Sequence, residues 1–187
     1  MRGFLGEIMK KVCMIVDNGF EELEAVGTFA ILRRAGLSVD IFACNNTNAT
    51  GRFGLTCSHL NDLSTFNPDS YDALILPGGP QYQALEKNSV VQNAIKQFLS
   101  KEKIVAAICA SPTILGHAGY LKGKNYTCFT SMNEDFGGNF TGQYATADGN
   151  IITGQSAAAT IDFAFAIVEK LLGKDEVERV KKSIYYK

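Results

Sequence analysis

The stretch Lys103-Ile-Val-Ala-Ala-Ile-Cys-Ala-Ser-Pro-Thr-Ile-Leu115 combines the pattern of a buried strand with that of a helix start. Its first half is a continuous apolar run rich in β-branched residues, which is typical of a strand buried on both faces of a parallel sheet. Its second half begins a helix, because Ser111 can cap it and Pro112 fits the first turn. Cys109 stands between the two halves, so we predict an elbow that lifts its side chain out of the sheet.

Two interpretations of Cys109 follow from these residues. At a helix start, the helix dipole and unpaired N–H groups favour the thiolate, which would make the cysteine reactive. A free cysteine is also one of the most buried residue types, and most such cysteines only fill the core. The position of Cys109 at a strand end leaves the two interpretations balanced, so other motifs must decide between them.

The composition indicates one compact domain. The chain has 187 residues, of which 46% are hydrophobic and 20% charged, enough for a sizeable core. Its net charge of −1 gives no indication of binding to nucleic acid or to an acidic membrane surface. No apolar run is long enough to span a bilayer, and the apolar part of the N-terminus is too short for a signal peptide. We expect a cytoplasmic protein with an extension at 1–10 and a single domain at 11–187.

The cysteines point to a reducing environment. There are five, an odd number, scattered along the chain: Cys13, Cys44, Cys57, Cys109 and Cys128. No Cys-x-x-Cys motif occurs, and no histidine lies near a cysteine at the spacing of metal ligands. This pattern argues against a disulfide framework or a zinc site. We expect neither a metal nor a cofactor.

Apolar strands alternate with amphipathic helices along the chain. Strands are expected at 11–16, 37–43, 72–77, 103–108 and 124–130, with a strand or hairpin arm at 52–58 and a hairpin at 145–153. Helices are expected at 21–34, 90–100, 112–118, 160–172 and 175–183. In the first of these helices, the side chains expected to face inward are Leu23, Val26, Phe29, Ala30 and Leu32. The alternation predicts an α/β sandwich around a mainly parallel sheet.

Ligands in such folds bind beyond the carboxyl ends of the strands. Asp17, Gly78-Gly79 and Cys109 all follow predicted strands, so we expect them near one another. Glycines at such a place let the backbone approach a ligand and present amides to an anion. The alternative is a simple tight turn after Pro77, since glycine and proline mainly mark turns.

A cluster of carboxylates, Glu21-Glu22-Leu23-Glu24, follows the first strand. Acidic residues in a first helical turn complement the helix dipole, which explains Glu21 and Glu22. Glu24 lies beside apolar positions and could point back toward the strand ends. If it met Cys109 there, the stable arrangement would be a thiolate with a protonated carboxylic acid that donates a hydrogen bond to the sulfur. Such a pair can exchange a proton with a substrate.

The two histidines fit this site poorly. His117 lies about two turns into the helix after Cys109, roughly 12 Å along the helix axis. His59 lies in a loop between predicted elements. A cysteine–histidine pair needs hydrogen-bond reach, so we expect neither histidine to take part in the chemistry.

Four motifs, in this order and spacing, resemble the ThiJ/PfpI superfamily and most of all its DJ-one branch. They are Gly-Phe-Glu-Glu-Leu-Glu-Ala-Val at 19–26, Arg-Arg-Ala-Gly at 33–36, Leu-Pro-Gly-Gly at 76–79 and Ala-Ile-Cys-Ala-Ser-Pro at 107–112. The segment Ile-Asp-Phe-Ala-Phe-Ala-Ile-Val-Glu at 161–169 is also similar to that branch. The resemblance extends from about residue 11 to the end of the chain.

The resemblance implies a flavodoxin-like, three-layer α/β sandwich that forms a homodimer. It implies that Cys109 is the reactive, peroxide-sensitive cysteine and that Glu24 is its protonated carboxylic partner. It also implies that the backbone amides of Gly79 and Ala110, with Gly78 beside them, form the pocket for an oxyanion or a sulfinate.

The activities implied are those of a glutathione-independent glyoxalase, which converts methylglyoxal to lactate, or of a deglycase of methylglyoxal adducts. Both belong to defence against oxidative and carbonyl stress. The alternative is a redox-sensing, chaperone-like protein whose Cys109 is oxidised to sulfinate. Both functions need the same pocket, so the motifs do not separate them. The expected partners are a small aldehyde and a second copy of the chain, with no membrane and no specific nucleic acid.

Two positions depart from relatives. Ala110 stands where the protease and heat-shock-chaperone branches place a histidine, which argues against a cysteine–histidine protease or an amidotransferase. Phe129 stands where some DJ-one relatives have a histidine. The loss of that histidine leaves Glu24 as the expected proton carrier.

Overall fold

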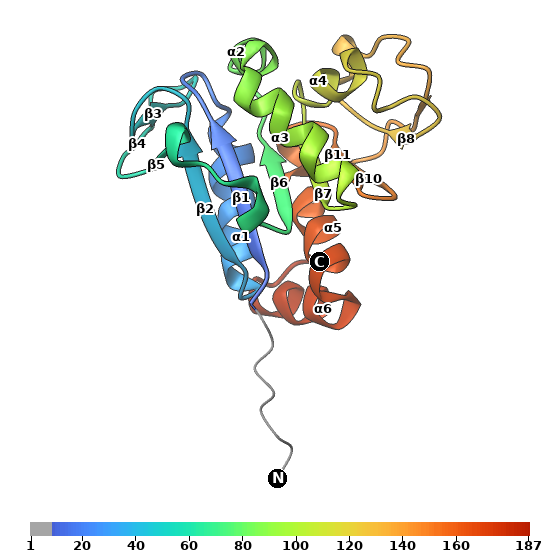
Figure 1. Cartoon of the computed structure of the whole chain (residues 1–187). Coiled ribbons are helices and arrows are strands. Elements are labelled where there is room, and N and C mark those ends of the chain that lie inside the picture. Colours follow the sequence, from blue (N-terminus) through green and yellow to red (C-terminus); the bar gives the residue numbers. More distant parts are fainter. Residues whose placement is uncertain (1–8) are drawn as a thin grey trace.

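The computed structural model describes residues 9–187. The expected N-terminal extension falls largely on residues 1–8, which lie outside the described residues. The described chain forms three layers, with a seven-stranded sheet between two layers of helices (Figure 1). This arrangement confirms the α/β sandwich that the alternation of elements predicts.

The central sheet has the strand order β10-β11-β7-β6-β1-β2-β5. Its strands are β1 (Lys11–Val16), β2 (Ser38–Ala43), β5 (Asn61–Asp62), β6 (Ala73–Leu76), β7 (Ile104–Ile108), β10 (Ala145–Asp148) and β11 (Ile151–Gly154). All neighbouring pairs are parallel except β10 with β11. Strands β6 and β7 are buried along their whole length, because helices cover both of their faces.

Two small sheets flank the central one. Strands β3 (Ala49–Thr50) and β4 (Thr56–Cys57) form an antiparallel hairpin, and β8 (Asn125–Tyr126) pairs in parallel with β9 (Asn139–Phe140). The expected strand at 124–130 is therefore only two residues long and lies outside the central sheet. After Tyr126 the backbone bonds to the elbow instead of a strand, because the Phe129 N–H donates to the Cys109 carbonyl at 2.8 Å.

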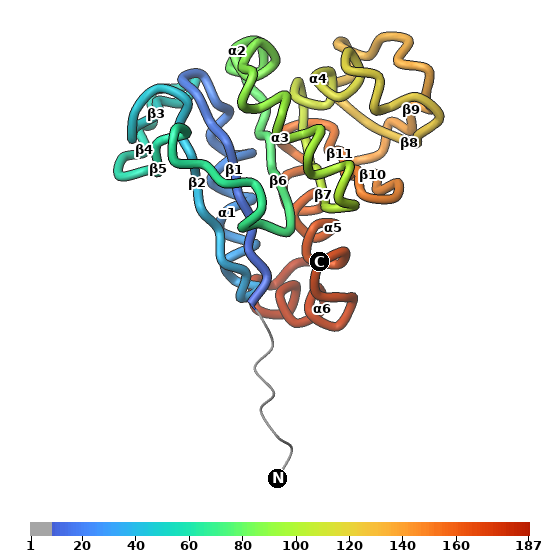
Figure 2. The backbone as a smooth tube through the Cα atoms, in the orientation of Figure 1, coloured from blue at the N-terminus to red at the C-terminus, as the bar shows by residue number. Residues whose placement is uncertain are grey.

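Helices cover the sheet on both sides, as the backbone trace in Figure 2 shows. One apolar layer holds α1 (Thr28–Arg34), α5 (Thr160–Leu172) and α6 (Lys174–Ser183), and the other holds α3 (Ser89–Ser100) and α4 (Pro112–His117). The short helix α2 (Tyr82–Lys87) lies beside α3. Among residues 9–187, none of the helices combines the length and the apolar character needed to cross a bilayer.

The helix expected at 21–34 is not uniform. It begins with a π-helical turn, η1 (Leu23–Gly27), and continues as α1. The buried side carries Glu24, Ala25, Thr28, Ile31 and Leu32. The expected inward positions of Leu23, Val26 and Ala30 are wrong, since Leu23 is 53% and Val26 is 42% exposed and Ala30 lies on the surface. Glu24 and Thr28 are polar, so the hydrophobic pattern does not reveal the face that is buried.

Candidate active site

Cys109 follows β7 directly and has a backbone φ of 65°. This left-handed conformation is uncommon for a residue with a side chain, and it persists only where the surroundings hold it. The Cys109 N–H donates to the Gly154 carbonyl at 2.9 Å, while its own carbonyl accepts the bond from Phe129. Helix α4 begins three residues later, at Pro112. The predicted strand-turn-helix elbow is therefore present.

Ser111 does not cap the helix, contrary to the prediction. Its backbone is already helical, with φ −70° and ψ −24°, and its side chain makes no capping bond. The buried hydroxyl donates instead to the Pro77 carbonyl at 2.6 Å. This bond ties the elbow to the turn that follows β6.

Glu24 points from η1 toward the same place. Its side chain is fully buried, and its Oε2 accepts a hydrogen bond from the Gly78 N–H at 2.9 Å. The carboxyl lies beside Cys109, since both side chains pack against Gly78 and each group shifts the pKa of the other. Its second oxygen, Oε1, is buried without a hydrogen-bond partner among residues 9–187. Single π-helical turns occur frequently at functional sites, and here such a turn carries the carboxyl.

Burial raises the pKa of Glu24 from 4.5 to about 7, with a further contribution from the charge of Glu21. The neighbouring Cys109 thiol, the hydrogen bond from the Gly78 N–H and the charge of Arg52 act in the opposite direction. A large fraction of Glu24 is therefore protonated at neutral pH. In that form it can donate a hydrogen bond to the Cys109 sulfur.

Burial also raises the pKa of the Cys109 thiol, and so do the charge and hydrogen bond of Glu24. Hydrogen bonds from the Ala110 amide and the Ser156 hydroxyl lower it. The direction is opposite to the lowered thiol pKa that a helix start predicts. The reason is that α4 has only six residues, so its field is weak, whereas the thiol is largely desolvated.

The two glycines after Pro77 allow this close packing. A Cβ on Gly78 would lie 2.5 Å from Glu24 Oε2 and 2.7 Å from the Cys109 Cβ, so no larger residue fits between them. Gly79 has a φ of 89°, and a Cβ there would lie 2.4 Å from the Gly19 carbonyl oxygen. The Gly78 N–H is used by Glu24, whereas the Gly79 N–H has no acceptor within the described chain.

A pocket of about 410 Å³ opens above Cys109. Among the predicted site residues, Cys109, Glu24, Gly79 and Ala110 line it, and Gly78 lies directly behind them. Arg52, which the resemblance matches to a family arginine near the dimer contact, also lines it, and the sequence interpretation missed further lining residues, among them Phe53, Tyr82, Met132 and Ser156. Ser156 follows β11, the neighbour of β7, so the rule that ligands bind at strand ends could have found it.

Other candidates lie outside this pocket. Asp17 is at the same edge of the sheet, but its Oδ1 accepts a hydrogen bond from the Asn45 side chain and its N–H donates to Gln81. His117 bridges Glu86 and Glu134 on the surface, and His59 is exposed in a loop. In the described part of the chain, no cluster of three or more His, Cys, Asp or Glu side chains could hold a metal ion.

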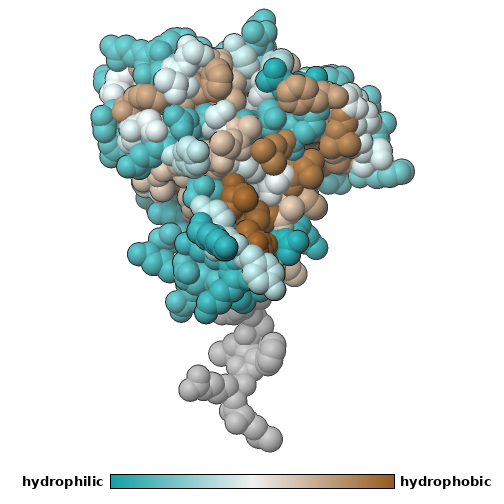
Figure 3. Space-filling model, turned by 180° about the vertical axis from the view of Figure 1, so that it is seen from behind, coloured by the Kyte–Doolittle hydropathy of each residue, from teal (hydrophilic) through white to brown (hydrophobic). Residues whose placement is uncertain are grey.

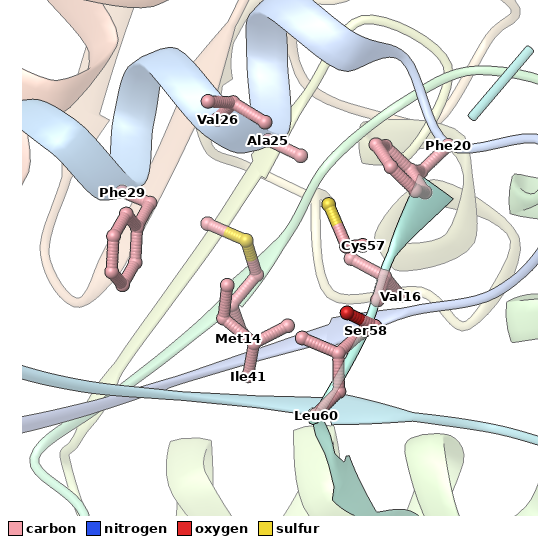
Figure 4. Close-up of a pocket in the computed structure, with 10 residues that line it drawn as sticks. All are labelled: Met14, Val16, Phe20, Ala25, Val26, Phe29, Ile41, Cys57, Ser58 and Leu60. Carbon is pink, nitrogen blue, oxygen red and sulfur yellow. The ribbon is translucent and has the colours of Figure 1, made fainter. Parts of the chain in front are cut away.

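A second pocket, of about 320 Å³, adjoins the other side of η1. It is lined almost entirely by apolar side chains, and Cys57 and Ser58 come from the β3–β4 hairpin and the residue that follows it. Figure 4 shows the Cys57 sulfur and the Met14 side chain pointing into the space beneath Ala25. None of the described residues that line this pocket is charged, in contrast to the pocket at Cys109.

The family model described as DJ-1/PfpI matches residues 10–170 of the sequence. The chain belongs to the DJ-1/PfpI family. It is 32% identical to the protein dj-1beta of Drosophila melanogaster, with 94% of this chain and 96% of the relative covered. The crystal structure of Drosophila melanogaster DJ-1beta superposes with a TM-score of 0.89 at 30% identity, covering 95% of this chain and 98% of that one.

Two further relatives extend the comparison. A DJ-1 superfamily protein from Salmonella typhimurium, crystallised as a cysteine-to-alanine mutant, has a TM-score of 0.86 at 31% identity and covers 96% of this chain and all of its own. A deglycase from Pyrococcus horikoshii is 28% identical over 79% of this chain and 91% of its own length. These matches confirm the resemblance and the fold that the four motifs indicate.

Proposed function

We propose that this DJ-1/PfpI protein is a cysteine-dependent enzyme of the glyoxalase or deglycase type, acting on methylglyoxal or its adducts in carbonyl and oxidative stress. The observation that carries the proposal is the buried Glu24 carboxyl beside the Cys109 thiol at the base of an open pocket. The similarity to the deglycase from Pyrococcus horikoshii supports the same class of chemistry.

In the first step, the Cys109 sulfur bonds to the aldehyde carbon of methylglyoxal. The thiol proton passes by way of Glu24 to the carbonyl oxygen, which gives a hemithioacetal. The developing negative charge on that oxygen is stabilised by the N–H groups of Gly79 and Ala110. Because the Gly79 N–H has no protein acceptor in the described chain, it is available for this role.

In the second step, Glu24 moves a proton between the two carbons of the dicarbonyl. The carboxylate form removes the proton from the carbon bonded to sulfur, and the acid form returns it to the neighbouring carbon. A pKa of about 7 allows both forms near neutral pH. The product is a lactoyl thioester of Cys109, and attack by water releases lactate and restores the thiol.

The test is methylglyoxal consumption together with lactate formation, followed by NMR. We expect Cys109→Ala to be inactive and Glu24→Gln to lose at least about 100-fold in rate, which is typical for removal of a general acid–base group. Glu178→Gln, on α6, is the matched control and keeps the wild-type rate. Equal rates for the wild type and the two site variants would contradict the enzyme proposal.

Redox sensing is the second candidate function. Glu24 Oε1 is buried without a hydrogen-bond partner among residues 9–187, and a sulfinate on Cys109 would supply oxygens for it to bind. Phe129 lines the pocket where a histidine would assist turnover, which also favours sensing. The test is intact mass after mild peroxide, where sensing predicts two added oxygens that Cys109→Ala lacks.

We propose that the protein acts as a homodimer through the face of η1 and α5. Leu23, Val26 and Ile161 are exposed there, and Figure 3 shows apolar side chains gathered on this side of the molecule. Exposed apolar residues grouped in this way are typical of a protein interface. We further propose that residues 11–187 work as one domain in the cytoplasm, where the five free cysteines would stay reduced.

A further inference from the structure

Arg52 is the only cationic side chain among the described residues that line the Cys109 pocket. It lies in the loop between β3 and β4, and its guanidinium is 4.8 Å from the ring centre of Phe53. Within residues 9–187 the guanidinium makes neither a hydrogen bond nor an ion pair with the protein. A cation that faces a pocket without a counter-ion is available to an anionic ligand.

The loop that carries Arg52 is anchored to the start of the π-helical turn. The Arg52 N–H donates to the Phe20 carbonyl at 2.9 Å, and the Phe53 N–H donates to Glu22 Oε1 at 2.6 Å. A Cβ on Gly51 would lie 2.3 Å from the same Glu22 oxygen, so the loop is packed tightly against this side chain. These contacts hold the base of Arg52 at the mouth of the pocket.

The two carboxyl groups of the pocket are already engaged. Glu24 is partly protonated near neutral pH because its pKa is about 7, and Glu21 Oε2 accepts a hydrogen bond from the Glu24 N–H at 2.8 Å. The charge of Arg52 is felt at Glu24, whose pKa it lowers. Arg52 therefore acts on the same space in which the Cys109 sulfur meets its substrate.

We propose that Arg52 selects substrates with a carboxylate a few bonds from the reacting dicarbonyl, so that the preferred class is acidic 2-oxoaldehydes such as 4,5-dioxopentanoate. This inference rests on the proposed glyoxalase function and names its substrate class. A planar guanidinium can bind a carboxylate through two parallel hydrogen bonds. The pocket of about 410 Å³ lies in the range that accepts ligands much larger than methylglyoxal.

The proposed reaction needs only water as a co-reactant. Cys109 adds to the aldehyde carbon, and Glu24 moves the proton from that carbon to the neighbouring ketone carbon. The aldehyde carbon is thereby oxidised to a thioester while the ketone is reduced to an alcohol, so no external oxidant or reductant is required. Hydrolysis of the thioester then gives 2-hydroxyglutarate, one proton and the free thiol.

The first test compares kcat/KM for 4,5-dioxopentanoate with that for 2-oxohexanal, a neutral 2-oxoaldehyde of similar length. We expect the wild type to prefer the acid at least about tenfold, the worth of one charge-assisted hydrogen bond. Arg52→Gln should bring the ratio close to one by raising KM for the acid. Arg52→Lys should keep an intermediate ratio, because it keeps the charge but loses the planar fork.

Lys96→Gln removes a surface charge on α3 and serves as the control, with the wild-type ratio expected. A wild-type ratio of one, or a ratio that Arg52→Gln leaves unchanged, overturns the proposal. Melting temperatures of all variants exclude a loss of folding as the cause of any change.

The second test does not depend on turnover. Iodoacetate and iodoacetamide alkylate thiols in the same way but differ in charge, and peptide mass spectrometry measures the rate at Cys109 for each. Relative to free N-acetylcysteine, we expect the ratio of iodoacetate to iodoacetamide rates to be at least about fivefold higher at Cys109 and to fall to one in Arg52→Gln. A protein that turns over neither aldehyde refutes the proposed function, whereas a wild-type alkylation ratio of one refutes the anion site.

Discussion

The two pockets beside η1 share one helical turn and one hairpin region, yet they differ in character. From the same turn, Glu24 enters the pocket of Cys109 while Ala25 and Val26 line the apolar pocket. From the same hairpin, Arg52 lines the first pocket and Cys57 the second. Neighbouring residues of one segment thus supply ionisable side chains to the Cys109 pocket and mainly apolar side chains to the second pocket.

The comparison shows that the surroundings of a thiol determine what it can do. In the Cys109 pocket, the Ala110 amide and the Ser156 hydroxyl lower the pKa of the thiol, and the Glu24 carboxyl lies beside it. Burial and the charge of Glu22 raise the pKa of Cys57, and no hydrogen bond from the described residues stabilises its thiolate. A carbonyl substrate would find a proton carrier at Cys109 and none at Cys57.

The strongest test of this contrast replaces each of the two cysteines by alanine in a separate variant. We expect Cys109→Ala to lower methylglyoxal turnover by at least about 1,000-fold, since loss of a nucleophile removes the covalent route. Cys57→Ala should stay within about twofold of the wild type, because the apolar pocket supplies no group to the reaction. Steady-state rates of methylglyoxal turnover by the purified proteins measure this difference. Comparable losses of rate in both variants would contradict the functional difference between Cys109 and Cys57.

A second test uses the buried carboxyl and its dependence on pH. Glu24 ionises at 4.5 in the unfolded chain and at about 7 in the folded protein. Between these values the folded state holds the extra proton, so stability falls as pH rises through this window and levels off above it. Relative to Glu24→Gln, whose amide stays neutral, the wild type should lose about 3 kcal/mol between pH 4 and pH 8.

Urea unfolding of both proteins across this pH range measures the difference. The other titrating groups are common to both proteins and cancel. A difference that does not change with pH would mean that Glu24 ionises normally in the fold. Such a result would contradict the assignment of an acid–base group to the Cys109 side of η1.

A third test concerns the glycine between Glu24 and Cys109. We expect Gly78→Ala to lose about 1–3 kcal/mol of stability and most of its activity, because the added methyl group overlaps both side chains. Gly36→Ala is the matched control, since its φ of 81° is strained for alanine but no atom of residues 9–187 lies within 4 Å of the added Cβ. The control should lose about 1–2 kcal/mol and keep its activity. Thermal melts and turnover together separate the two effects.

The smallest expected effect concerns the exposed apolar face. Val26→Asp places a charge among apolar side chains on η1, so the proposed dimer should dissociate at least about tenfold more readily. Light scattering across a range of protein concentrations measures this change. Asp is accommodated by the monomer because Val26 is 42% exposed. A wild-type protein that is monomeric at all concentrations would contradict the proposed dimer through the face of η1 and α5.

Most of the central sheet could be predicted from the sequence, because continuous apolar runs mark buried strands. Such runs, with the start and stop residues beside them, predict β7 and the turn at Cys109. They also predict both ends of α5. The sequence also identifies Glu24 as a side chain that can reach the strand ends. Its position near Cys109 can be predicted because the carboxyl ends of parallel strands lie at the same edge of the sheet.

The remaining features depend on contacts between distant segments. The turn η1 buries Glu24 and Thr28, so the hydrophobic pattern gives the wrong inward residues in the first turns, although Leu32 is buried as expected. Ser111 was assigned to a cap because local spacing does not show the Pro77 carbonyl, which lies 34 positions away. Arg52 belongs to a loop whose position is set by Phe20 and Glu22, and no periodic pattern records that.

The bond between Glu24 and Gly78 spans 54 positions in the chain, and Cys109 lies further along still. Glu24, the proposed proton carrier, follows β1, the Gly78 amide follows β6, and Cys109, the proposed nucleophile, follows β7, so three strands must pair before the site exists. Contacts of such long range are slow to form during folding. In a nascent or partly folded chain, Cys109 therefore lacks its partners and resembles the other four cysteines. The time at which the proposed aldehyde turnover begins during refolding would measure when the sheet is complete.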